Sequence, residues 1–246
     1  MRIDIWSDIV CPFCYVGKRN LEQALAEFEH RDEVEVVWHS FELDPSATEY
    51  PAGSLPEMIA SKYQMPLEQA IATQESLAER AREVGLDFNW RQARYGNTFD
   101  AHRVIHYAAE QGLASAAEEA FKKAYFTQGR SVQDHESILD IASEIGLDTA
   151  EVEAVLKSDR YAADVRADEQ LARQLGINGV PFFLIESKWA VSGAQPAEAL
   201  VQALRQVWEE THRVEFLNPL AGATGDAAGN NAAEAGPSCD MNGNCS

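Results

Sequence analysis

The chain has 246 residues, a formal net charge of −20 at pH 7, and hydrophobic residues make up 46% of it. This length exceeds that of most single domains, so we expect one large domain or a domain that carries an insertion. The acidic balance argues against nucleic acids and anionic membranes as partners, and no segment approaches the ~18 consecutive apolar residues of a membrane span.

The N-terminal region has the pattern of a β-α-β unit. Residues 2–6 alternate as a strand does, and residues 12–30 place apolar side chains at helical spacing. Residues 34–43 alternate again and are rich in β-branched side chains. A unit of this length predicts two parallel strands joined by a right-handed crossover. The first residues contain no signal-peptide apolar region, so a chain that starts at its natural Met1 is expected in the cytoplasm.

A C-x-x-C motif, Cys11 to Cys14, stands where the first strand gives way to the first helix. A cysteine at a helix N-terminus meets unpaired N–H groups and the positive end of the helix dipole, which lower the thiol pKa. Pro12 suits the first turn because its missing N–H would have no partner there. One attacking thiolate and one resolving thiol suffice for thiol–disulfide exchange. Half a zinc site and an inert structural pair are the alternatives.

The middle of the chain, residues 45–176, shows amphipathic helical patterns and no convincing strand. We interpret this stretch as an inserted helical domain. The predicted helices cover residues 55–62, 67–84, 98–111, 114–127, 134–145, 149–157 and 159–175. His102 and His106 fall on one helical face, where they could hold a metal ion, but no third ligand is evident. A polar network at the junction of insert and core is the alternative that we favour.

The α/β pattern returns near the end. Residues 180–186 and 188–193 predict an antiparallel hairpin, and Pro196 opens a helix that runs to about Glu210. The order β-α-β, insertion, β-β-α outlines a thioredoxin fold of the α/β class, formed by residues 1–44 and 177–217. Residues 218–246 contain almost no large apolar side chain, so we expect a flexible tail. That tail carries Cys239 and Cys245.

Four segments of the chain carry a family resemblance: Asp8-x-x-Cys11-Pro12-Phe13-Cys14-Tyr15-x-Gly17, Asn97-Thr98-x-Asp100-Ala101-His102-Arg103, Gly179-Val180-Pro181 and Gly193-Ala194-Gln195. Together they resemble the DsbA-like thioredoxin family, in particular its FrnE and 2-hydroxychromene-2-carboxylate isomerase-like branch. The resemblance extends from residue 1 to about residue 212. The cysteine-bearing tail is an addition that resembles a FrnE protein with a second C-x5-C pair.

The resemblance implies roles for individual residues. Cys11 would be the nucleophile and Cys14 the resolving thiol. The Val180–Pro181 bond would be cis and would lie against the cysteines; Pro181 would then block metal capture, and Val180 would offer backbone hydrogen bonds to an extended client. Isomerase members of the branch carry serine at the position of Cys11, so the presence of both cysteines favours disulfide chemistry.

Three further side chains are predicted to support the site. Phe13 is expected to lie exposed between the thiols, where it could contact an unfolded client. Asp8 is interpreted as a cap of the first helix, with proton transfer as its alternative. His39 lies on the second strand and could favour ionisation of the thiol as a cation, or could be a satisfied structural imidazole.

The tail cysteines allow a second redox pair. About 22 residues separate Leu217 from Cys239, and a flexible linker of that length has an r.m.s. reach of ~25 Å. Cys239 and Cys245 could therefore exchange electrons with the first pair; an idle tail and thiolate metal binding are the alternatives.

The sequence thus predicts a cytoplasmic thiol–disulfide oxidoreductase, acting as a disulfide oxidase or isomerase. Its expected partners are disulfide-containing or unfolded proteins and a small thiol such as glutathione. We assign no cofactor, no metal, no nucleic acid and no membrane to it, and expect a monomer or homodimer. The alternatives are a glutathione-dependent isomerase of a small aromatic substrate and a non-enzymatic metal-binding or chaperone-like module.

Overall fold

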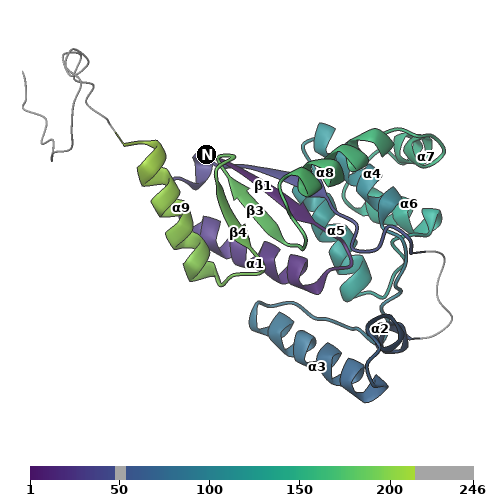
Figure 1. The fold of residues 1–246 in the computed structure, drawn as a ribbon. Coiled ribbons are helices and arrows are strands. Elements are labelled where there is room, and N and C mark those ends of the chain that lie inside the picture. Colours follow the sequence, from purple (N-terminus) through teal and green to yellow (C-terminus); the bar gives the residue numbers. More distant parts are fainter. Residues whose placement is uncertain (48–53, 214–246) are drawn as a thin grey trace, which may run out of the picture. The chain divides into compact units, whose positions relative to one another are not determined.

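The structure, a computed structural model, describes residues 1–47 and 54–213 (Figure 1). The chain divides into two compact units, Met1–Trp208 and Glu209–Ser246. In the second unit the description ends at residue 213. The expected flexible tail with Cys239 and Cys245 therefore lies outside the described residues. No helix in the described ranges combines the length and the apolar character needed to cross a membrane.

A mixed four-stranded sheet organises the first unit, with strand order β2-β1-β3-β4. β1 (Arg2–Ser7) pairs in parallel with β2 (Glu35–Ser40), and this pairing places Trp6 beside His39. β3 (Phe182–Ile185) runs antiparallel to β1, and β4 (Trp189–Ser192) antiparallel to β3. The predicted β-α-β unit and the C-terminal hairpin are both confirmed. β3 begins only after Pro181, which has no N–H to give to a strand ladder.

The helices follow the predicted order, and seven of the described ones lie between β2 and β3. α1 (Pro12–Glu27) joins β1 to β2 through a short 3-10 turn (Arg31–Glu33), and α9 (Ala197–Thr211) follows β4. The helices between β2 and β3 are α2 (Leu55–Tyr63), α3 (Leu67–Glu83), α4 (Phe99–Glu110), α5 (Ala114–Phe126), α6 (His135–Glu144), α7 (Thr149–Leu156) and α8 (Ala162–Gln174). The boundaries of the insert as a separate domain, 45–176, remain a prediction.

Local sequence signals explain several helix starts. Asp148 accepts hydrogen bonds from the backbone N–H groups of Ala150 and Glu151, so the predicted cap at the start of α7 is confirmed. Asp134 caps α6 through the N–H of Ser137 in the same way. α8 begins three residues later than predicted, because Tyr161 adopts a left-handed conformation with φ +62°.

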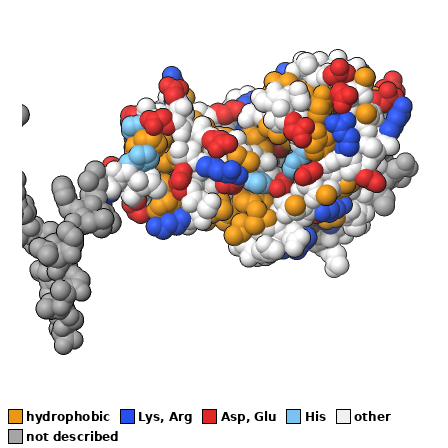
Figure 2. Space-filling model, turned by 90° about the horizontal axis from the view of Figure 1, so that it is seen from above, with side chains coloured by type: hydrophobic (Ala, Val, Ile, Leu, Met, Phe, Trp, Pro, Cys, Tyr) orange, Lys and Arg blue, Asp and Glu red, His pale blue; other side chains and the backbone are white. Residues whose placement is uncertain are grey.

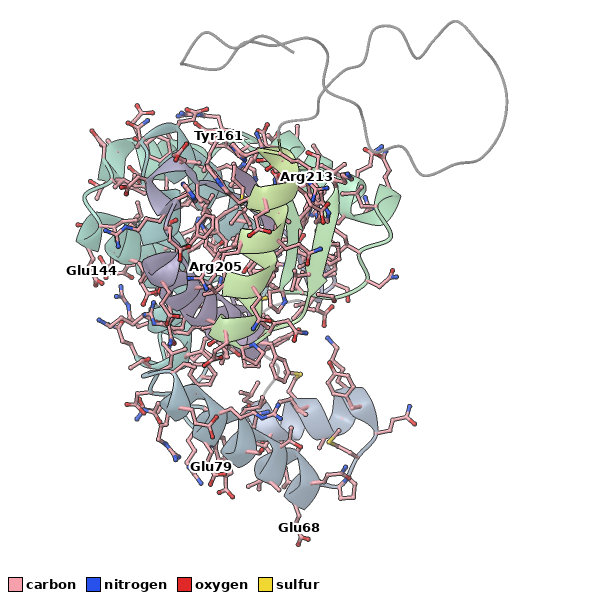
Figure 3. All side chains as sticks on the ribbon, turned by 90° about the vertical axis from the view of Figure 1, so that its left-hand side faces the viewer. Glu68, Glu79, Glu144, Tyr161, Arg205 and Arg213 are labelled. Atoms are coloured by element: carbon pink, nitrogen blue, oxygen red, sulfur yellow. The ribbon has the colours of Figure 1, made fainter. Side chains whose placement is uncertain are left out.

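Helices cover both faces of the sheet (Figure 1). On one face, apolar side chains of α1 and α9 pack against β1 and β3, with Leu21 and Leu204 among the buried residues. On the other face Trp6 packs with Ala172 of α8 and with Ile177. Arg205, labelled on α9 in Figure 3, donates to Glu29 beyond the end of α1. β1 is therefore packed on both faces of the sheet.

A second core joins the helical segment to the active-site helix. Phe121 and Tyr125 of α5, with Ile138 of α6, are almost completely buried. Ile9 and Tyr15, which flank the C-x-x-C motif, belong to the same cluster. α2 and α3 pack on each other, and α3 also contacts α1; Glu68 and Glu79 point outward from α3 (Figure 3). The helical segment therefore packs directly behind the predicted site.

Candidate active site

Cys11 is the N-cap residue of α1. Its backbone is extended, with φ −86° and ψ 114°, and Pro12 follows as the first helical residue. The Cys14 N–H donates to the Cys11 carbonyl at 3.1 Å, which closes the first turn of the helix. Both cysteines are free thiols. The predicted helix start is confirmed, and the Cys11 sulfur lies where the positive end of the helix dipole favours an anion.

The loop before β3 approaches Cys11 from the other side. The Val180–Pro181 peptide bond is cis, and the Cys11 thiol donates to the Val180 carbonyl with a sulfur–oxygen distance of 3.6 Å. Gly17 allows this approach, because a Cβ placed there would stand 2.9 Å from Cγ of Pro181. The structure thus brings together residues that are 169 positions apart in the chain.

Both thiols are buried, but the side chain between them in the sequence is exposed. Cys11 is 4% exposed and Cys14 only 1%, whereas Phe13 between them is 40% exposed, as predicted. A pocket of about 420 Å³ adjoins Pro12 and Phe13 and is bounded by Arg80 of α3 and the segment before α9. Figure 2 shows acidic side chains spread among hydrophobic ones over the face it draws. A substrate therefore reaches Cys11 over a small part of its surface, beside an aromatic side chain.

The two cysteines have pKa values that are shifted in opposite directions. A hydrogen bond from the Cys14 thiol lowers the pKa of Cys11, and this outweighs burial, which acts in the opposite direction. Burial, together with that same hydrogen bond, raises the pKa of Cys14 well above its ordinary value. Cys11 is thus the thiol that ionises first, and Cys14 retains its proton.

A buried charge pair behind the thiols was not predicted. Lys122 and Glu118, one turn apart on α5, are 0% and 1% exposed and bond to each other. The Lys122 ammonium favours the anionic form of both cysteines, and Ser7 of β1 donates to Glu118 at 3.5 Å. In the sequence this pair is a glutamate and a lysine four residues apart on the apolar side of α5. The same spacing is typical of ordinary ion pairs on exposed helix surfaces, so it does not reveal the burial.

The interpretation of Asp8 as a helix cap is wrong. Among the described residues, no side chain caps the N-terminus of α1. Asp8 is fully buried, and its carboxylate accepts from the backbone N–H of Leu43 at 2.8 Å. The other oxygen faces His102 at 3.4 Å. Asp8 turns inward because the segment after β2 and helix α4 both pack against the loop that carries it.

His39 is a structural imidazole, the second of the two roles considered for it. None of its described hydrogen bonds is to a cysteine. Its two ring nitrogens face Asp168 at 2.7 Å and Asp4 at 2.8 Å, and the ring stacks on Trp6. Burial would lower the pKa of His39, but hydrogen bonds with the two aspartates outweigh it and raise the pKa. His39 therefore joins β2 to β1 and α8.

His102 and His106 diverge although they share one face of α4. His102 faces Asp8, whereas His106 lies 3.1 Å from Asp168 of α8 and from the Ser40 hydroxyl. The expected polar network is present, with Asp100 bonded to Arg103 at 2.7 Å. Among the described side chains, no group of three or more potential ligands is placed to hold a metal ion.

Comparison with known proteins places this geometry in a family. Residues 2–205 match the model of the DSBA-like thioredoxin domain. The uncharacterized protein YwbO of Bacillus subtilis is 30% identical over 188 residues, which are 75% of this chain and 86% of YwbO. The predicted thioredoxin fold of the DsbA type, with its large helical insertion, is thereby confirmed.

Two solved structures give the same fold. A probable DsbA oxidoreductase from Streptomyces coelicolor is 43% identical with a TM-score of 0.83, covering 100% of this chain and 98% of its own. The cytosolic disulfide reductase DsbM from Pseudomonas aeruginosa, solved with GSH, is 19% identical with a TM-score of 0.58, covering 87% and 100% of the two chains. The latter similarity concerns the fold alone.

Proposed function

The chain belongs to the DSBA-like thioredoxin domain family, and on that premise we propose that it catalyses thiol–disulfide exchange as a disulfide oxidase or isomerase. Cys11 is the nucleophile and Cys14 the resolving thiol. One observation carries the proposal: Cys11 stands at the N-cap of α1 against the loop of Val180 and Pro181, with its pKa lowered while that of its neighbour is raised.

The reaction follows from this difference in pKa. The Cys11 thiolate attacks one sulfur of a substrate disulfide, and the second sulfur leaves as a thiolate that takes a proton from water. A mixed disulfide between Cys11 and the substrate results. Cys14 then loses its proton and attacks the Cys11 sulfur, which forms the Cys11–Cys14 disulfide and releases the reduced substrate. The reverse sequence oxidises a dithiol substrate.

The surface around Cys11 suggests which substrates enter. The pocket beside Phe13 combines apolar side chains with Arg80 and Glu83 of α3. An exposed aromatic ring beside a mixed pocket suits an unfolded or disulfide-containing polypeptide. We include a small thiol such as glutathione as the proposed reductant. A cytoplasmic location is likewise part of the proposal, and so is a monomeric or homodimeric state.

The tail cysteines extend the cycle. We propose that Cys239 and Cys245 exchange with the Cys11–Cys14 pair and so return it to its working state. The test is a variant with serine at both tail positions. Turnover should slow under conditions where regeneration limits the rate, while a single turnover proceeds as in the wild type.

Replacement of each active-site cysteine tests the main proposal. Cys11→Ser should abolish exchange with a disulfide-containing protein. Cys14→Ser should retain the first attack and accumulate a mixed disulfide with the substrate, which a reductant cleaves. Both changes replace one sulfur atom by oxygen, and circular dichroism serves as the control for folding. Disulfide reduction or reshuffling by the Cys11→Ser protein would refute the assignment of the nucleophile.

A further inference from the structure

The loop between α8 and β3 carries an Asn178–Gly179 dipeptide directly before Val180. In such a pair the backbone nitrogen of the glycine attacks the side-chain amide of the asparagine readily, because glycine has no side chain to obstruct the approach. Of the asparagines in residues 1–47 and 54–213, Asn178 alone precedes a glycine, and each of the others precedes a larger side chain.

Both reacting groups of this dipeptide are accessible. Asn178 and Gly179 are exposed, in a stretch that is neither helix nor strand. The Gly179 N–H has no hydrogen-bond acceptor in the part of the chain that the structure describes. The Asn178 amide donates to the Gly176 carbonyl at 3.0 Å in a solvent-exposed bond, which holds the amide only weakly. The Gly179 nitrogen is therefore free to act as a nucleophile.

The ends of this loop are held in place on either side of the dipeptide. Ile177, directly before Asn178, is 3% exposed and packs in the core on the α8 face of the sheet. Pro181 is buried as well. Between these two anchors lies Val180, whose carbonyl accepts from the Cys11 thiol at 3.6 Å. A change in the backbone at Asn178 must therefore be absorbed where the loop meets the nucleophile.

We propose that Asn178 is a deamidation site and that its conversion slows the attack of Cys11 on a disulfide. The Gly179 nitrogen bonds to Cγ of Asn178, and the amide nitrogen leaves as ammonia, which carries away the Gly179 proton. A succinimide ring results. Water then opens the ring at either carbonyl and gives aspartate or isoaspartate at position 178. One water is consumed and one ammonia is released, and no atom is oxidised or reduced. The effect on Cys11 rests on the proposed thiol–disulfide exchange.

The two products affect Cys11 differently. Each adds a negative charge two residues before Val180, and a negative charge disfavours a nearby thiolate. A unit charge roughly 10 Å from a sulfur changes the thiolate population about twofold in water. Isoaspartate also routes the main chain through the former side chain, which lengthens the loop between its two anchors and displaces the Val180 carbonyl. A misplacement of about 1 Å can cost on the order of 10²-fold in rate, so isoaspartate should have the larger effect.

Ageing of the full chain tests both parts of the proposal. Reduced protein is held at mildly alkaline pH with dithiothreitol, beside a synthetic peptide of residues 174–182. Peptide mass analysis follows the exchange of NH₂ for OH at Asn178. After removal of the reductant, stopped-flow absorbance with 5,5′-dithiobis(2-nitrobenzoic acid) gives the rate at which Cys11 releases the first coloured thiolate. Gly179→Ala is the matched control, because alanine obstructs ring closure while its Cβ meets no described atom within 4 Å. Asn242–Gly243, outside the described residues, is unchanged in this control.

Wild-type protein should convert at Asn178 within a few fold of the rate of the peptide. Gly179→Ala should convert on the order of tenfold more slowly, because alanine excludes backbone conformations that glycine adopts. The rate of Cys11 attack should fall in step with conversion in the wild type and stay constant in Gly179→Ala aged in the same way. Fresh Asn178→Asp protein, which carries the charge without the longer backbone, should attack about twofold more slowly than fresh wild type.

Each failure has its own signature. If fresh wild-type protein releases no coloured thiolate, the proposed function fails, whereas mass analysis still decides whether Asn178 is modified. If Asn178 keeps its amide when half of the peptide has converted, the deamidation site is overturned. If Asn178 converts and the rate of Cys11 attack stays that of fresh protein, the effect on the active site is overturned. Loss of rate in aged Gly179→Ala at the pace of wild type would assign that loss to another change and overturn the same effect.

Discussion

Gly17 lies at the contact between the active-site helix and the loop that carries Pro181. A Cβ at position 17 would stand 2.9 Å from Cγ of Pro181 and 3.4 Å from Cζ of Phe183. A proline ring has little freedom to move, so Gly17→Ala must push the Pro181 loop away from α1. The Val180 carbonyl in that loop accepts a hydrogen bond from the Cys11 thiol. The substitution therefore lowers the stability of the fold and also changes the surroundings of the Cys11 sulfur.

Two opposing terms determine the magnitude. Alanine in a helix interior gains about 0.8–1 kcal/mol over glycine through helix propensity. Overpacking of a well-packed contact costs typically 1–3 kcal/mol, and a contact below 3 Å with a rigid ring belongs in the upper part of that range. We expect a net loss of about 1–2 kcal/mol in the free energy of unfolding. The rate of Cys11 attack should fall as well, because the loop no longer holds its place beside the sulfur.

Urea unfolding of the reduced protein measures the first effect, as a lower midpoint with an unchanged slope. Gly179→Ala is the matched control, since it lies in the same loop and a Cβ there meets no atom of the described residues within 4 Å. The control should be neutral or slightly stabilising. If Gly17→Ala unfolds at the same urea concentration as the control, or at a higher one, the steric argument is refuted.

Two further predictions concern ionisation. Hydrogen bonds with Asp168 and Asp4 raise the pKa of His39, so its contribution to stability is complete below the ordinary histidine pKa of about 6.5 and is lost as pH rises through the raised value. The loss of unfolding free energy in His39→Gln should therefore be largest between about pH 5, above which the aspartates are ionised, and about pH 6.5, and should shrink at higher pH. A loss independent of pH would contradict this. Because the pKa is lowered at Cys11 and raised at Cys14, iodoacetamide near neutral pH should modify Cys11 alone, as peptide mass analysis would reveal, and preferential modification of Cys14 would reverse the assigned roles.

Local patterns were sufficient for much of the fold. The alternation in β1 and β2, the Cys-Pro start of α1 and the cap at Asp148 all depend on neighbours within a few residues, and the structure agrees with each of them. The interpretation of Asp8 failed for the opposite reason. Its spacing from α1 suits a cap, but the segment after β2 and helix α4 provide partners that no local pattern contains.

The sequence by itself determined that a thiol pair stands at the start of a helix after an apolar strand, because backbone periodicity and capping are local properties. Only the tertiary structure decided what surrounds that pair. Lys122 resembles a surface residue until α5 packs against α1, and His102 resembles half of a metal site until α4 turns it toward Asp8. Burial and charge at a sulfur atom are sums over everything packed around it, and they exist only once distant segments meet.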